Sequence, residues 1–208
     1  MNALSFVLGI PLLGGLVLAL VGHQPRARDV NVGFSLWTFL ACCVMTYEVI
    51  DGGPQFLWAK QFYIDPLNVF LVTLTAFVSL TTAIFSRPYM RVEQDHGKMT
   101  PKRLRLYHSM YQLFGFTMLL GLTTNNLGII WVAMEAATLT TVLLVSVYRT
   151  PASLEAAWKY FILCGVGIAQ ALFGTILVYM AADKVLGSEH ATLLWLAAIA
   201  FGRWIAYE

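Results

Sequence analysis

Long apolar segments alternate with short polar connections along most of the chain. Six of these segments are long enough to cross a hydrocarbon core of about 30 Å as helices, which rise about 1.5 Å per residue. They cover residues 4–21, 33–50, 66–86, 108–124, 127–148 and 156–182, and a seventh begins near residue 191. Barrel strands would alternate polar and apolar residues over about ten positions, which these segments do not. The pattern therefore predicts transmembrane helices, whose backbone groups pair within each segment.

The predicted fold class is all-α: a polytopic membrane helix bundle with six transmembrane helices and a partial seventh. Turn residues stand between the segments, with Gly52, Gly53 and Pro54 after the second segment and Pro151 before the sixth. No linker or low-complexity tract interrupts the series. We therefore expect residues 1–208 to form a single transmembrane domain.

The composition supports lipid as the solvent for most of the surface. The chain of 208 residues is 59% hydrophobic and 12% charged, whereas about a quarter of the residues of a soluble domain are charged. A net charge of +2, without a basic patch, argues against nucleic acid as a partner. The first segment lacks a basic start and a cleavage pattern, so it is expected to be a retained helix rather than a signal peptide.

The cysteines and histidines give no pattern of a metal or cofactor site. Cys42, Cys43 and Cys164 all lie in apolar segments, and none belongs to a CxxC motif or a Cys/His cluster. The sequence also has no nucleotide-binding loop and no arrangement of catalytic residues. We therefore expect no cofactor, no metal and no catalytic centre in this chain itself.

Basic residues are concentrated in alternate connections between the helices. The first, third and fifth connections, with the start of the sixth segment, hold Arg26, Arg28, Arg87, Arg91, Lys98, Lys102, Arg103, Arg105, Arg149 and Lys159. Because Lys and Arg are enriched in cytoplasmic loops, these connections are predicted to be cytoplasmic. The amino terminus is then predicted to face the periplasm or the outside of the cell.

Glu135 is the most informative residue, because it lies in the middle of the fifth apolar segment. An ionisable side chain near the bilayer centre costs about 3 kcal/mol on insertion scales, and such residues commonly mark proton relays. Thr138 follows one turn later on the same face and is a candidate supporting polar group. We therefore predict a role in proton translocation for Glu135. The alternative is a protonated structural residue that is hydrogen-bonded to neighbouring helices.

Lys159 is the second candidate for proton translocation. It lies four residues after Glu155, the favourable order for an ion pair on one helix. Measured from the predicted end of each segment, Glu135 lies about 20 Å inside the cytoplasmic surface and Lys159 only about 5 Å inside it. The two side chains are then too far apart to touch, and coupling would need water or further polar groups. The alternative is a lysine that extends to the membrane interface.

Three further features have mainly structural interpretations. Asp65 before Pro66 is predicted to cap the third helix. Gly167, Ala171 and Gly174 form a stripe of small residues, which predicts a close contact of the sixth helix with a neighbour. Residues 87–107 are expected to form a cytoplasmic loop near anionic lipid, with a docking surface for a soluble partner as the alternative.

Several motifs resemble those of a known family. Residues 123–135 read TTNNLGIIWVAME, an Asn, an apolar stretch, an aromatic residue and then an intramembrane Glu. The other matching segments read FSRPYM at 85–90, LRLYH at 104–108, YRTP at 148–151 and EAAWKYFILCGVG at 155–167. Together they resemble the antiporter-like proton-channel subunits of the complex I superfamily, and in particular the F component of hydrogenase-4, over roughly residues 1–187.

The resemblance implies proton translocation across the cell inner membrane, coupled to redox chemistry in other subunits of a hydrogenase, formate hydrogenlyase or NADH-quinone oxidoreductase type of complex. The family's intramembrane Glu matches Glu135, and its basic residue near the start of the next helix matches Lys159. Family members are more than twice as long and carry a central Lys in the next helix, where this chain reads AFGRWIAYE at 200–208. We therefore expect an amino-terminal portion, truncated near residues 187–208. A non-conducting structural subunit or truncated remnant is the alternative function.

Overall fold

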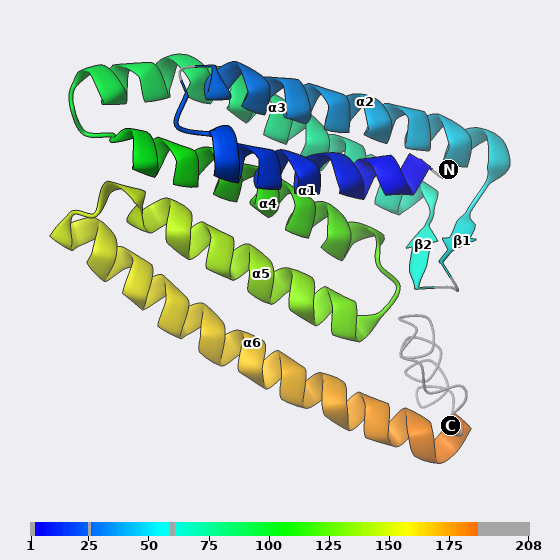
Figure 1. Ribbon diagram of the computed structural model, residues 1–208. Helices are drawn as coiled ribbons and strands as arrows, with labels where there is room; N and C mark the ends of the chain where they lie inside the picture. The colour runs from blue at the N-terminus through cyan, green and yellow to red at the C-terminus, as the bar shows by residue number, and fades with distance from the viewer. Residues whose placement is uncertain (1–2, 25, 59–60, 187–208) are drawn as a thin grey trace.

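The computed structural model describes residues 3–24, 26–58 and 61–186, and within them the chain folds as an antiparallel bundle of helices (Figure 1). The helices are α1 (Ala3–Val21), α2 (Ala27–Gly52), α3 (Pro66–Asp95), α4 (Pro101–Thr123), α5 (Leu127–Val145) and α6 (Pro151–Leu186). A short 3-10 helix, η1 (Ser146–Tyr148), precedes α6, and the strands β1 (Gln55–Leu57) and β2 (Phe62–Ile64) form a small hairpin between α2 and α3. The predicted all-α membrane bundle is confirmed. The predicted seventh segment lies outside the described residues.

Five of the six described helices are long and apolar enough to cross a membrane by themselves, and α4 is the exception. The α4 helix packs against α1, α2, α3 and α5, and it occupies the middle of the bundle in Figure 1. Its buried polar side chains therefore face other helices rather than lipid. The chain is a multi-pass membrane protein, and its least apolar helix is covered by its more apolar neighbours.

The helices continue beyond the apolar segments, so the predicted loop at residues 87–107 is wrong. The α3 helix runs through Pro88 to Asp95, and α4 begins at Pro101, after Thr100 accepts a capping hydrogen bond from the Arg103 N–H. Only residues 96–100 connect the two helices. Hydropathy marks where a helix leaves the hydrocarbon, whereas caps mark where the helix ends, and here the two places differ.

A small apolar cluster holds this part of the molecule together. Met90 and Met99 pack with Leu104 of α4 and with Val147 of η1. Arg103 donates hydrogen bonds to the carbonyl oxygens of Lys98 and Tyr148, both at 3.3 Å. We call this end of the bundle, where α1–α2, α3–α4 and α5–α6 are connected, the basic end. It is built from helix ends and a short connection rather than from a long loop.

The opposite end carries the β hairpin, and we call it the hairpin end. Asp65 caps α3 as predicted, because its carboxylate accepts the Asn68 N–H at 2.7 Å. The Gln61 carbonyl accepts the Asn125 N–H at 2.7 Å, and the Gln61 side-chain oxygen accepts the Asn126 amide at 2.7 Å. The hairpin is therefore tied to the connection between α4 and α5. Two strands this short, separated by a turn of mixed composition, were not predicted from the sequence.

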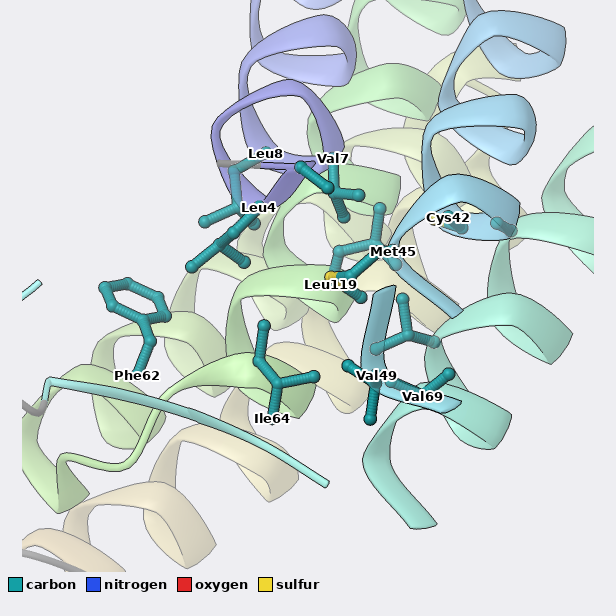
Figure 2. Close-up of a cluster of buried hydrophobic side chains, with 13 residues drawn as sticks. Leu4, Val7, Leu8, Cys42, Met45, Val49, Phe62, Ile64, Val69 and Leu119 are labelled. Carbon is teal, nitrogen blue, oxygen red and sulfur yellow. The ribbon is translucent and has the colours of Figure 1, made fainter. Parts of the chain in front are cut away.

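The main apolar cluster lies toward the hairpin end, where α1, α2, α3, α4 and the hairpin meet (Figure 2). Leu4 and Val7 of α1 pack with Met45 of α2 and Leu119 of α4, and Ile64 of β2 closes the cluster. These side chains are at most 2% exposed. Burial of each contributes on the order of 1.5–3 kcal/mol relative to exposure to water, although between helices in lipid the gain comes mainly from close packing.

Two glycines allow α1 to fit closely between α2 and α4. A Cβ atom at Gly14 would lie 2.9 Å from the Phe34 ring of α2, and one at Gly15 would lie 2.9 Å from Leu113 Cγ of α4. Next to this contact, the Ser109 hydroxyl donates a hydrogen bond to the Gly15 carbonyl at 2.8 Å. Small residues at such contacts let helix backbones approach one another in lipid.

We predict that Gly15→Ala destabilises the bundle by about 1–3 kcal/mol, because the added methyl group overpacks the contact with Leu113. The measurement is the free energy of unfolding of the purified chain in mixed detergent micelles. The matched control is Gly9→Ala, since nothing lies within 4 Å of a Cβ atom at Gly9 in the same helix. Equal stability of the two variants would show that α1 does not make this close contact.

Candidate functional site

Glu135 is the ninth residue of α5, about 12 Å from the start of the helix and about 15 Å from its end. The start is fixed by Asn126, whose side-chain oxygen accepts the Gly128 N–H at 2.8 Å and the Ile129 N–H at 3.4 Å. The α5 helix packs between α4 and α6. Glu135 is half-buried at the middle of this three-helix layer, near the expected centre of the membrane.

The Glu135 carboxyl group makes no hydrogen bond or ion pair with any other described residue. Thr138 is buried, but its hydroxyl donates to the Met134 carbonyl at 3.0 Å, within the same helix. Thr138 therefore lies beside Glu135 as predicted from its spacing, but its hydroxyl proton is already used.

Lys159 lies in the third turn of α6, because the helix begins before the predicted apolar segment. The α6 helix begins at Pro151 because Thr150 and Ser153 cap it reciprocally: the Ser153 N–H donates to the Thr150 hydroxyl at 3.1 Å and the Thr150 N–H to the Ser153 hydroxyl at 3.0 Å. Lys159 is then about 12 Å from the start of the helix. Its ammonium pairs with Glu155 at 2.5 Å, with both side chains more than 60% exposed. A surface pair of this kind contributes at most about 1 kcal/mol.

One hydrogen bond fixes the register of α5 on α6 and so relates Glu135 to Lys159. The Trp131 indole N–H donates to the Ile168 carbonyl at 2.9 Å. From this level, Glu135 lies about 6 Å toward the basic end and Lys159 about 13 Å in the same direction. The structure does not bring the two side chains into contact. Their separation along the bundle is about 7 Å, roughly half of what the sequence suggested, and a short chain of water molecules could span it.

The predicted close contact through the small-residue stripe of α6 does not occur among the described residues. Gly167, Ala171 and Gly174 are all exposed, and nothing lies within 4 Å of a Cβ atom at either glycine. Instead, Ala157 and Phe161 of α6 face Leu139 and Val142 of α5, and with their neighbours they line an apolar groove of about 430 Å³. Because α6 is apolar on all sides, its sequence could not show which face packs on α5.

Sequence reasoning missed a buried polar contact between α2 and α4. The Gln112 side-chain amide donates to the Asn31 carbonyl and side-chain oxygens, at 3.0 and 2.8 Å, and to the Ser35 hydroxyl at 3.0 Å. His108, one turn before Gln112, is 1% exposed. The sequence contains a pattern that could have indicated this contact: each of the two helices carries polar residues four positions apart, at 31 and 35 in α2 and at 108 and 112 in α4. We call this contact the α2–α4 seam.

The seam continues into a small cavity at the centre of the first four helices. Its volume is about 10 Å³, and hydroxyl groups of α2 and α3 line it together with Gln112 and with apolar side chains such as Leu119. A cavity of this size is about large enough for one water molecule. In the part of the chain that the structure describes, no three His, Cys, Asp or Glu side chains gather as metal ligands would. The polar groups that line this cavity are hydroxyl and amide groups, which form hydrogen bonds.

A family domain and several curated proteins are similar to this chain, and all of them are components of related redox or antiporter systems. Residues 124–199 match the membrane domain of NADH:quinone oxidoreductase and Mrp antiporter proteins, a segment that contains Glu135, Thr138 and Lys159. The chain is 43% identical over 195 residues to a hydrogenase-4 component F homolog of Methylacidiphilum infernorum, which covers 94% of this chain and 40% of that protein. It is 26% identical over 179 residues to NADH-quinone oxidoreductase subunit N of Thioalkalivibrio sulfidiphilus, covering 84% of this chain and 35% of that one.

The matched domain and these relatives support an antiporter-like subunit of the complex I superfamily as the family of this chain. The chain spans about a third to two fifths of the length of the curated relatives that it matches. The segment that matches the NADH:quinone oxidoreductase and Mrp antiporter domain starts at the connection between α4 and α5. It therefore includes the helix that carries Glu135. The α2–α4 seam lies outside the matched domain but within the longer region of similarity to the hydrogenase-4 homolog.

We predict that Gln112→Leu destabilises the bundle by about 1–3 kcal/mol, because Asn31 and Ser35 lose their buried partner. The measurement is the midpoint of thermal unfolding of the purified chain in detergent. The control is Gln170→Leu, since Gln170 is exposed on α6 and its replacement should leave the midpoint unchanged or raise it. If both variants unfold at the wild-type temperature, the α2–α4 seam does not stabilise the bundle.

Proposed function

We propose that this chain is a membrane subunit of a hydrogenase-4, formate hydrogenlyase or complex I-like redox complex, and that it contributes to proton translocation coupled to electron transfer. The relatives named above are a hydrogenase-4 component and a subunit of NADH-quinone oxidoreductase. Electron transfer belongs to other subunits under this proposal. The expected partners are the membrane and hydrophilic subunits of such an assembly, together with the lipid bilayer.

The observation that carries the proposal is the position of Glu135. A carboxyl group at mid-helix, half-buried and without a partner among the described residues, costs free energy that a structural residue would recover through hydrogen bonds. Intramembrane carboxyl groups of this kind commonly mark places where protons are bound and released within the membrane. Glu135 is therefore the titrating group in this proposal, and Thr138 supports it as a nearby oxygen that can accept a hydrogen bond from water.

Lys159 acts in the proposal as the cation nearest to Glu135 on α6. At a separation of about 7 Å along the bundle, it is within reach of Glu135 through a short chain of water molecules. In the proposal, Lys159 alternates between Glu155 and a position nearer Glu135 during the cycle. The exposed pair with Glu155 is weak enough to open during each cycle.

We further propose that the chain lies in the cell inner membrane with its amino terminus on the periplasmic side. The basic end gathers cations from three separate connections, and the chain side with most Lys and Arg usually faces the cytoplasm. At that end, Arg87 of α3 pairs with Asp29 of α2 at 2.6 Å, while the hairpin end is short of basic residues. This orientation places the hairpin and the start of α5 toward the periplasm.

The rival function is a non-conducting structural subunit or a truncated remnant. The exposed stripe of small residues on α6 favours packing against a further helix, which either function allows. The discriminating experiment must therefore measure proton movement rather than assembly.

We predict that Glu135→Gln in the assembled complex lowers proton translocation at least about 100-fold, because a side chain that transfers protons is replaced by one that cannot. The measurement is acidification coupled to electron transfer in vesicles that contain the purified complex. Recovery of the intact complex by gel filtration checks that the variant still assembles. Unimpaired translocation in this variant would reject the role of Glu135.

The matched control is Glu48→Gln, because Glu48 is an exposed carboxylate of α2 near the hairpin end. It should assemble and translocate protons as the wild type does. If Glu48→Gln also abolishes translocation, loss of any membrane carboxylate disturbs the complex, and the effect of Glu135→Gln does not identify Glu135 as the proton-carrying group. Loss of assembly in Glu135→Gln alone would favour the structural function.

We predict that Lys159→Met slows proton translocation and that Lys159→Arg largely restores it, because Arg keeps the positive charge. The measurement is the initial rate of translocation in vesicles that contain the purified complex. An unchanged rate in Lys159→Met would leave Lys159 with only the exposed ion pair to Glu155.

A further inference from the structure

A groove at the basic end lies outside the site described above. It opens where the last turn of α1, the first turns of α4 and the connection between η1 and α6 converge. Its volume is about 350 Å³. The lining residues are Ala19, Lys102, Arg105, Leu106, Ser109, Met110 and Arg149.

Three of these residues are cations without an acidic partner among the described residues. Lys102 and Arg105 lie one turn apart on α4, and Arg149 joins them from a segment more than 40 positions later in the chain. The acidic side chains that form ion pairs within the described part of the chain are Asp29, Glu93 and Glu155, and they pair with other cations. The groove therefore gathers three positive charges that nothing described in the protein neutralises.

Arg149 is held in place by an unusual backbone conformation. Its φ angle of +52° lies in the left-handed region, where a residue with a side chain is uncommon. The conformation ends η1, and the Arg149 N–H donates to the Ser146 carbonyl at 3.0 Å. The strained backbone thus lets the chain turn into α6 while the Arg149 side chain remains at the groove.

The other wall of the groove is apolar and leads onto the lipid-facing side of α1. Ala19, Leu106 and Met110 form this wall. Leu16 and Leu20, close to Ala19 on α1, are 55% and 75% exposed. Beside the groove the end of α1 lies close to α4, since a Cβ atom at Gly22 would lie 3.0 Å from Arg105 Cα. Positive charge at one end and an apolar track at the other fit a molecule with an anionic head and an apolar tail.

We propose that the groove binds the headgroup of an anionic phospholipid. Lys102, Arg105 and Arg149 contact the phosphate, and an acyl chain follows Ala19, Leu16 and Leu20 along α1. Basic pockets between membrane helices on the cytoplasmic side are suited to anionic headgroups, with a gain in binding for each basic residue near the surface. An acidic segment of a soluble protein would find the same charges but would leave the apolar wall and the exposed leucines uncovered. The inference does not depend on the role of Glu135.

The test compares two double variants of the full chain in its purified complex. Lys102→Gln with Arg149→Gln removes two charges from the groove. The control, Arg26→Gln with Arg91→Gln, removes two exposed charges from the same end but from outside the groove. After delipidation, each complex is titrated with phosphatidylglycerol, with phosphatidylcholine and with inorganic phosphate, and bound lipid is counted by native mass spectrometry.

We expect the wild type and the control to retain one phosphatidylglycerol per chain that phosphatidylcholine does not replace. In the groove variant this lipid should bind roughly 10- to 30-fold more weakly, as the loss of two surface charges implies. Equal weakening in both double variants would overturn the proposal, since general surface charge would explain it. Displacement of the lipid by inorganic phosphate at similar concentration would overturn it in favour of a simple anion site. Release of a protein subunit, with lipid binding unchanged, would overturn it in favour of a docking surface for that subunit.

Discussion

The burial of α4 is the constraint on which the rest of the bundle depends. This helix is too polar to cross a membrane alone, because a polar group that faces lipid without a partner costs several kcal/mol. It crosses because α1, α2, α3 and α5 surround it and because Ser109, Tyr111 and Gln112 find hydrogen-bond partners there. Ser109 bonds to α1, and Gln112 bonds to two residues of α2. Each of these hydrogen bonds also fixes the register of a neighbouring helix on α4. The bonds that satisfy the polar side chains of α4 therefore also position the helices around it.

The same constraint sets the depth of Glu135. The end of α4 is tied to the β hairpin through the short connection at Thr124 and Asn125. Asn126 then caps α5 and bonds to Gln61 of the hairpin. Because a capped helix rises by a fixed distance per residue, fixing its start also fixes the level of its ninth residue. The hairpin is thus a positioning device for the carboxyl group, although it lies at the far end of the helix.

The two ends of the molecule are built in different ways. At the hairpin end, backbone and amide hydrogen bonds connect segments that are far apart in the chain. At the basic end, an apolar cluster of methionine, leucine and valine side chains joins α3, α4 and η1, and it leaves the cations at the surface. This arrangement packs the helix ends against one another and still leaves many cations at the surface. Charges that are held in place by packing bind a specific anionic group at a lower entropic cost than charges on an unpacked loop.

Much of the architecture followed from local rules. Segment length and polarity predicted six helices in the bilayer, and Asp65 before Pro66 predicted the cap of α3. The position of Glu135 within an apolar segment marked it as the candidate functional residue, since the cost of such a residue follows from its place along one helix. The predicted segments that correspond to α2, α3, α4 and α6 are shorter than the helices. Hydropathy marks only the apolar part of a helix, whereas capping by residues such as Thr100 and Thr150 extends the helix into water.

The sequence by itself therefore determined the number of helices within the described residues, their order, the place of Glu135 inside an apolar segment and the uneven distribution of charge, because each depends on neighbours along one chain segment. Only the tertiary structure decided which faces meet. It paired Gln112 with Asn31, turned the stripe of Gly167 and Gly174 away from α5, and brought Arg149 to Lys102. These outcomes depend on contacts between segments that are far apart in sequence. When a helix is apolar on every side, its own sequence does not indicate which face another helix will cover.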